Sequence, residues 1–230
     1  MRNLIRIFAS GLLLCTVCTA FGAGGGEMSQ PSSTTAGEPQ ALSRQQLLQM
    51  RYNAGVRAVE KGDDISADAA RQSDPKKRAK LLAKAKVAYG AAREKFLKAV
   101  ELDRNMPDTW NYLGYSSRQI GDYEDALLAY DRALTLKPGY PEAIEYRAHA
   151  YLGLGRLSEA KEAYLTLYAG NRKLAAQLLT AMQAWVGEHR ANPAGVDSAM
   201  LESFASWVSE RSTIAGQTAG LTREGASAAW

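Results

Sequence analysis

From Ser43 to about Arg211, apolar residues recur every three to four positions, and no convincing run alternates apolar with polar residues. This spacing places the apolar residues on one face of a helix, so the pattern predicts an all-α chain. Ser43 followed by Gln46 has the spacing of a capping box, and Asp74-Pro75 combines a cap with a proline in the first turn. We therefore expect helices that begin at these points, including one long helix from about Lys76 to Leu102.

An internal repeat of 34 residues runs through the middle of the chain. Three sets of positions recur at this spacing. The first set carries small residues, the second aromatic residues, and the third small or apolar residues. They are Ala92, Ala126 and Ala160; Phe96, Tyr130 and Tyr164; and Ala99, Ala133 and Leu167. The small residue allows a neighbouring helix to approach closely, and the aromatic ring fills the gap between hairpins. The period predicts stacked helical units.

The segment from Pro107 to Tyr140 carries the most complete copy of a known repeat pattern. Its tryptophan, leucine–glycine pair, alanines, aromatic residue and closing proline are Trp110, Leu113, Gly114, Ala126, Tyr130, Ala133 and Pro138. These residues resemble the tetratricopeptide repeat. The next segment, Pro141 to about Arg172, fits less well, with Ile144 for the tryptophan and Arg147 for the leucine. The resemblance covers roughly residues 44–172 and implies a right-handed superhelix of helical hairpins with a concave groove.

The first repeat differs from the others by an insertion. Gly55 and Gly62 correspond to Gly114 and Gly121, but each pair is 59 residues apart, which is one repeat plus 25 residues. The extra residues fall at 63–91, and we expect 63–73 to fold back along the long helix. The expected organisation is a signal peptide at 1–23, a flexible linker at 24–42, a repeat domain at 43–172, capping helices at 173–213 and a flexible tail at 214–230. The capping helices should carry Leu174, Leu178, Met182, Trp185 and Val186, and then Val196, Met200, Phe204, Trp207 and Val208.

The N-terminus has the pattern of a secretory signal peptide. Arg2 and Arg6 precede a short apolar run, and small residues follow, so we expect cleavage after Ala20, Gly22 or Ala23. Both cysteines, Cys15 and Cys18, fall inside this segment, which excludes disulfides and thiol chemistry from the mature chain. A retained membrane anchor or a lipidated cysteine stays open as an alternative.

Sequence patterns of catalysis or cofactor binding are missing. The two histidines lie in no metal-ligand spacing, and no phosphate loop, nucleophile elbow or dinucleotide fingerprint occurs. We therefore expect no cofactor, no metal and no enzymatic activity. The formal charge of +4 falls by two when Arg2 and Arg6 are removed, which is too small to indicate nucleic acid as a partner.

Two surfaces are candidates for binding. The resemblance implies that the first helix of each hairpin lines the groove, which places Tyr52, Val56, Val59, Asn111, Tyr115, Arg118, Glu145, His149 and Leu152 along it. Aromatic and arginine side chains contribute most to interfaces, so Tyr115 and Arg118 are the first candidates. The second surface is a basic patch of six residues in the insertion: Lys76, Lys77, Arg78, Lys80, Lys84 and Lys86.

Helix stability does not explain the basic patch, because cations at a helix N-terminus oppose the macrodipole. An anionic partner, such as an envelope surface, would explain it. Alternatively, Asp63, Asp64 and Asp68 fold back and neutralise it.

The sequence favours a periplasmic adaptor or assembly scaffold that binds a protein or peptide in its groove. A membrane-tethered envelope-biogenesis factor and an enzyme with an unrecognised site are the alternatives.

Overall fold

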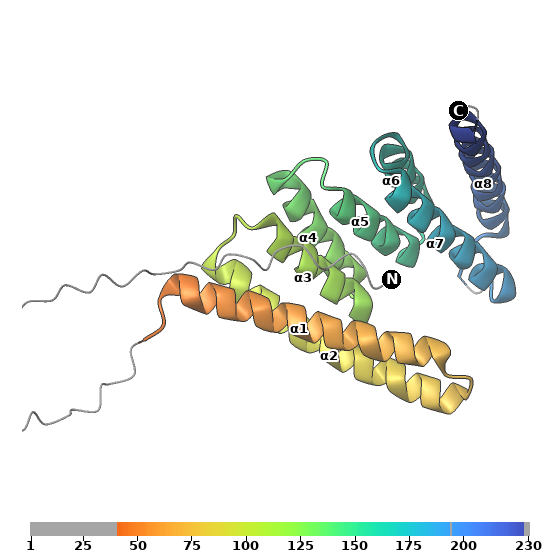
Figure 1. The fold of residues 1–230 in the computed structure, drawn as a ribbon. Coiled ribbons are helices and arrows are strands. Elements are labelled where there is room, and N and C mark those ends of the chain that lie inside the picture. Colours follow the sequence, from red (N-terminus) through yellow and green to blue (C-terminus); the bar gives the residue numbers. More distant parts are fainter. Residues whose placement is uncertain (1–40, 194, 228–230) are drawn as a thin grey trace, which may run out of the picture. The chain divides into compact units, whose positions relative to one another are not determined.

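The computed structural model describes residues 41–193 and 195–227, with side chains described up to residue 217. In this part of the chain the regular secondary structure consists of eight helices (Figure 1). They are α1 (Arg44–Arg71), α2 (Pro75–Leu102), α3 (Pro107–Ile120), α4 (Tyr123–Leu136), α5 (Pro141–Gly153), α6 (Leu157–Gly170), α7 (Arg172–Ala191) and α8 (Ser198–Ser227). The all-α prediction is confirmed. The expected signal peptide and nearly all of the expected linker lie outside the described residues.

The two helix starts predicted from capping signals are confirmed. The Gln46 amide donates to the Ser43 hydroxyl, and the Ser43 amide donates to the Gln46 side chain, which completes a capping box. At α2, the Asp74 carboxylate accepts hydrogen bonds from two amides of the first turn, with Pro75 at the first helical position.

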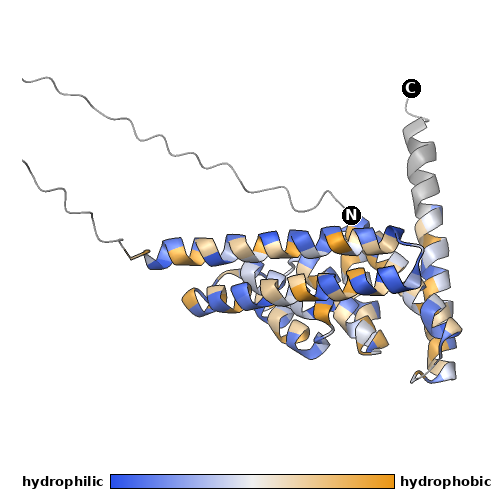
Figure 2. Ribbon diagram, turned by 90° about the horizontal axis from the view of Figure 1, so that it is seen from below, coloured by the Kyte–Doolittle hydropathy of each residue, from blue (hydrophilic) through white to orange (hydrophobic). Residues whose placement is uncertain are grey.

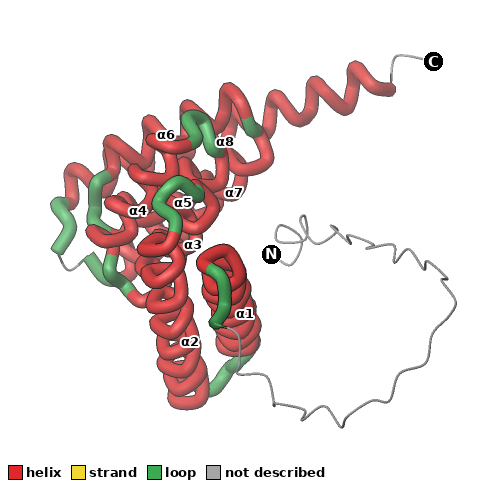
Figure 3. Tube along the Cα trace, turned by 90° about the vertical axis from the view of Figure 1, so that its left-hand side faces the viewer, coloured by secondary structure: helices red, strands yellow, loops and turns green. Residues whose placement is uncertain are grey.

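The insertion lengthens both helices of the first hairpin. Residues 63–71 lie along the long helix α2, as expected, and they do so as a continuation of α1 that ends at Arg71. The stretch from Asp63 to Arg71 contains neither proline nor glycine and includes three alanines, so nothing in it stops the helix. The chain reverses at 72–74, and α2 then returns alongside α1 (Figure 3).

The helices pair as successive hairpins, α1–α2, α3–α4, α5–α6 and α7–α8, and each pair packs on the next. First helices also contact one another, α1 with α3, α3 with α5, and α5 with α7. Hydrophobic and hydrophilic residues alternate along the exposed side of the long first hairpin (Figure 2). The predicted repeat of helical hairpins is therefore the architecture of the described chain.

Each of the first two hairpins closes around an aromatic ring that touches the backbone of its first helix. A Cβ atom on Gly55 would lie 2.6 Å from the Phe96 ring, and one on Gly114 would lie 2.6 Å from the Tyr130 ring. Both rings are completely buried. The absence of a side chain at these two glycines lets the helices come close enough for the ring to fill the space between them.

The repeated residues form the core. All nine side chains of the three triplets, beginning at Ala92, Ala126 and Ala160, are buried. The predicted stripe of α7 is buried as well. In α8 the buried residues are Leu201, Phe204, Ala205 and Val208.

The prediction for the C-terminal helices needs one correction. Val196 precedes α8 and Met200 is exposed, because the helix starts at Ser198 and its buried face is turned by one position from the predicted stripe. α8 continues to Ser227, through most of the segment 214–230 for which a flexible tail is expected.

The glycine contacts lead to a stability prediction with a matched control. Replacing Gly114 by alanine places a Cβ against the buried Tyr130 ring, and we expect it to lower the free energy of unfolding by about 1–3 kcal/mol. Gly90→Ala, in α2, meets no atom within 4 Å, so it should raise stability by about 0.5–1 kcal/mol through helix propensity. Urea unfolding followed by circular dichroism measures both. Equal midpoints for Gly114→Ala and the wild type would contradict the packing argument.

Candidate partner-binding site

Most of the predicted groove residues are structural. Val59, Asn111, Glu145 and Leu152 are buried, and therefore present little surface to a partner. Tyr52 and Val56 pack on the core of the first two hairpins, where the Tyr52 ring lies edge-on to Phe96 and to Tyr112. Tyr52 and Val56 are partly exposed, as are Tyr115, Arg118 and His149, and the last three lie outside this core cluster or on its edge.

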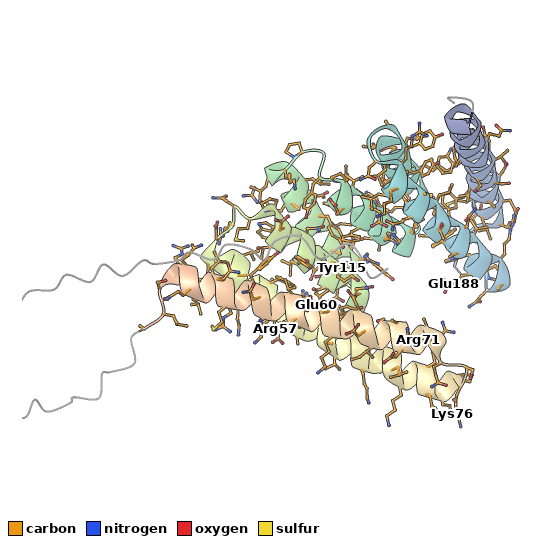
Figure 4. All side chains as sticks on the ribbon, viewed as in Figure 1. Arg57, Glu60, Arg71, Lys76, Tyr115 and Glu188 are labelled. Atoms are coloured by element: carbon orange, nitrogen blue, oxygen red, sulfur yellow. The ribbon has the colours of Figure 1, made fainter. Side chains whose placement is uncertain are left out.

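Tyr115 is bound within the protein by a carboxylate of the inserted region. Its hydroxyl donates to the Asp63 carboxylate at 2.7 Å, and the Tyr89 hydroxyl donates to the same oxygen at 2.7 Å. Figure 4 shows Tyr115 between α3 and α1. Burial, and then the nearby Asp63 charge, raise the pKa of Tyr115 well above its ordinary value. The cluster joins α1, α2 and α3, so Tyr115 fixes the long hairpin on α3.

Arg118 carries a positive charge that forms no contact ion pair among the described residues, although the Tyr130 hydroxyl and the Glu145 carboxylate lie near it. Its guanidinium lies 5.1 Å from the Tyr115 ring centre and 5.8 Å from that of Tyr146. Its Nε atom is shielded from solvent and has no hydrogen-bond partner. Among the described residues, no acidic side chain forms an ion pair with it. A partly exposed arginine that makes no contact ion pair of its own can pair with a bound anion.

A pocket of about 380 Å³ opens beside Arg118, and we call it the α3–α5–α7 pocket. It is lined by Lys86, Arg118, Gln119, Gly121, Tyr123, His149, Leu152, Gly153, Ala181, Ala184, Trp185 and Glu188. The pocket unites three predicted groove residues, Arg118, His149 and Leu152, with Lys86 of the predicted basic patch. His149 is paired with Glu145 at 2.8 Å, so Arg118 and Lys86 are the cations left for an anionic ligand.

The contribution of α7 was not predicted from the sequence. Ala181, Ala184, Trp185 and Glu188 line the pocket from this helix, which lies beside α5 as α5 lies beside α3. The Trp185 indole donates to the Leu152 carbonyl at 2.8 Å and ties the two helices together. The signal was available, because positions 181–188 lie one further repeat of 34 residues after 147–154. Because α7 lacks a tryptophan and a glycine at the positions where the repeat has them, the sequence pattern predicts this helix only as a terminal cap.

The other five residues of the basic patch extend along α2 to the turn of the first hairpin, where Figure 4 labels Lys76 and Arg71. All six patch residues are exposed. Two of the three expected neutralising acids are engaged elsewhere, because Asp63 accepts from two tyrosines and Asp68 pairs with Arg71, whereas Asp64 is exposed. Within the described chain, none of the six cations forms an ion pair.

Among the described residues, no group of three or more His, Cys, Asp or Glu side chains is arranged to hold a metal ion. No helix of this part has both the length and the apolar composition needed to cross a membrane.

Comparison with known proteins gives a family match and partial relatives. The family model of the tetratricopeptide repeat matches residues 107–140. The small glutamine-rich tetratricopeptide repeat-containing protein 2 of Mycosarcoma maydis is 36% identical over 76 residues, 33% of this chain and 22% of that protein. The peroxisomal targeting signal receptor of Kluyveromyces lactis is 31% identical over 118 residues, 50% of this chain and 21% of that protein. The matched segments therefore span about a fifth of each relative.

Among solved structures, two tetratricopeptide-repeat domains of human RPAP3 are similar. The second domain, in complex with the HSP70 peptide SGPTIEEVD, has a TM-score of 0.41 at 20% identity and covers 58% of this chain and 96% of that one. The first domain has a TM-score of 0.42 at 18% identity and covers 60% of this chain and 96% of that one.

The family model, the 34-residue spacing and the stacked hairpins agree with one another. The segment that the model matches is the α3–α4 hairpin, which carries the contact between Gly114 and Tyr130. The chain is a tetratricopeptide-repeat protein, with residues 107–140 as its best-defined repeat.

Proposed function

We propose that this protein is an exported adaptor that binds an acidic peptide or helix of a partner protein in the α3–α5–α7 pocket. The repeat itself supports a role in protein–protein interaction. A relative whose sequence matches half of this chain is a peroxisomal targeting signal receptor. The function is equilibrium binding, with a carboxylate of the partner placed between Arg118 and Lys86.

The unpaired charge of Arg118 is the observation that carries this proposal. A surface arginine needs no partner, but Arg118 has a shielded Nε and lies near two tyrosine rings. A partner carboxylate would form a direct ion pair with the guanidinium and accept hydrogen bonds from it. Trp185, Leu152 and the two alanines of α7 would receive apolar parts of the same partner.

A photo-crosslinking residue at Ala184, which lines the pocket, tests the site directly. We expect one discrete partner to be crosslinked in the envelope fraction, and Arg118→Ala to weaken its binding at least tenfold, or by about 1.4 kcal/mol. Arg57→Ala is the matched control, because Arg57 is exposed on α1, away from the pocket lining (Figure 4). Equal capture by the two variants would show that Arg118 does not anchor the partner.

Export is part of the proposal and rests on the N-terminal sequence. N-terminal sequencing of the protein purified from cells should find a mature chain that begins after Ala20, Gly22 or Ala23, in the periplasmic fraction. A chain that retains Arg2 and Arg6, or one that begins at a lipid-modified Cys15 or Cys18, would support the membrane-tethered alternative instead.

A second candidate function is contact of the basic patch with an anionic envelope surface. It is favoured by the exposure of all six cations and by the engagement of Asp63 and Asp68 elsewhere. Such contact would orient the adaptor, since attraction to a charged surface acts within about a Debye length.

Replacing Lys76, Lys77, Arg78 and Lys80 by glutamine tests this surface. Co-sedimentation with phosphatidylglycerol vesicles at low salt should fall at least tenfold, because attraction to the surface depends on local positive charge. The matched control removes the same charge elsewhere, as Lys61→Gln, Lys95→Gln, Lys98→Gln and Lys173→Gln. If both quadruple variants lose binding equally, net charge alone is responsible and the patch has no special role.

A further inference from the structure

A second cavity lies away from the α3–α5–α7 pocket, between the second helices of the first two hairpins. This α2–α4 groove has a volume of about 580 Å³ and shares no lining residue with that pocket. It is lined by Arg93, Leu97, Val100, Glu101, Arg104, Trp110, Leu113, Ser117, Asp125, Leu128, Ala129 and Arg132. Its floor is apolar and its rim is charged.

The groove exposes a leucine that the repeat does not require. Leu128 is 70% exposed, yet the same repeat position carries Glu94 in the first hairpin and Glu162 in the third. Both glutamates are exposed, so a polar residue is compatible with the fold at this position. Leu97, 37% exposed, faces the same groove from α2. Two exposed leucines on one cavity mark a surface for another apolar side chain.

The rim charges define the chemistry of the partner. Arg93 is neutralised by Asp125 and also donates to Ser117. Among the described residues, Arg104 and Arg132 have no acidic partner, whereas Glu101 is the single unpaired acid of the lining. The available charge of the rim is therefore positive, and a complementary partner carries carboxylates.

The form of the groove favours a helix as the occupant. α2 contributes Arg93, Leu97 and Glu101, and α4 contributes Asp125, Leu128 and Arg132, in each case at helical spacings of three or four residues, while Arg104 lies in the turn after α2. Two parallel rows of side chains at this spacing match the ridges of a third helix that lies between them.

We propose that the α2–α4 groove binds an amphipathic helix of a partner protein, with leucine-like side chains on one face and carboxylates at its edges. Leu97 and Leu128 contact the apolar face, and Arg104 and Arg132 pair with the carboxylates. The proposal goes beyond the peptide pocket, because it gives the adaptor a second binding surface formed by different helices.

The test uses the full chain and a fluorescein-labelled, alanine-based peptide of about 18 residues, long enough to form a helix. Leucines at i, i+4, i+7 and i+11 form its apolar face, and glutamates flank them. Fluorescence anisotropy should show saturable binding that is at least tenfold weaker for Leu128→Glu. Leu165→Glu is the matched control, because Leu165 is 48% exposed on α6 and lies outside the groove; it should bind like the wild type.

A charge exchange tests the rim. Arg104→Glu combined with Arg132→Glu should lose the glutamate peptide and gain binding of a version with lysines at the same positions. Arg118→Ala should bind the glutamate peptide like the wild type, which separates this surface from the α3–α5–α7 pocket.

Three results would overturn the proposal. One is absence of saturable binding by the wild type, and another is equal weakening by Leu128→Glu and Leu165→Glu. The third is a dimer, detected by analytical ultracentrifugation, that Leu128→Glu dissociates. In that case the groove is occupied by a second copy of this chain.

Discussion

The close contact between a glycine backbone and an aromatic ring is the constraint on which the first two hairpins depend. At Gly55 and Gly114 the ring of Phe96 or Tyr130 takes the space of the missing side chain. The same kind of contact occurs between Gly62, which directly precedes the insertion, and Tyr89 within it. Gly62 follows Gly55 by seven residues and Tyr89 precedes Phe96 by seven, as antiparallel helices require. The insertion therefore keeps the spacing of the hairpin it extends.

The extension changes what the first helices present to a partner. Tyr89 is held against Gly62, and its hydroxyl shares Asp63 with Tyr115. This cluster fixes the long hairpin on α3 and uses a side chain that would otherwise be open. The same extension carries Lys86 to the side of Arg118, which creates a cationic pocket that includes a residue of the insertion. The extended hairpin thus engages Tyr115 within the protein and adds Lys86 to the pocket.

Acidic and basic side chains differ in how they are paired within the protein. Asp63 and Asp68 of the inserted region are engaged with tyrosines and with Arg71, whereas its cations remain exposed. Arg118, Arg104 and Arg132 also lack acidic partners within the described residues. Unpaired cations beside apolar cavities are suited to partners that combine carboxylates with apolar side chains. A protein with several such surfaces is suited to joining partners.

The sequence by itself determined the helices and their buried faces. Capping residues and prolines mark the helix starts, and the spacing of Ala126, Tyr130 and Ala133 identifies the repeat and its core, because both signals are local or periodic. Only the tertiary structure decided which distant side chains meet. Asp63 lies 52 residues from Tyr115, and Lys86 is separated from Arg118 by most of a repeat. Periodicity shows which face of a helix is buried, but contacts between neighbouring helices depend on how far each helix extends and how closely it packs. The absence of a stop signal after Asp63 allowed α1 to continue, and that extension placed Asp63 and Lys86 beside α3.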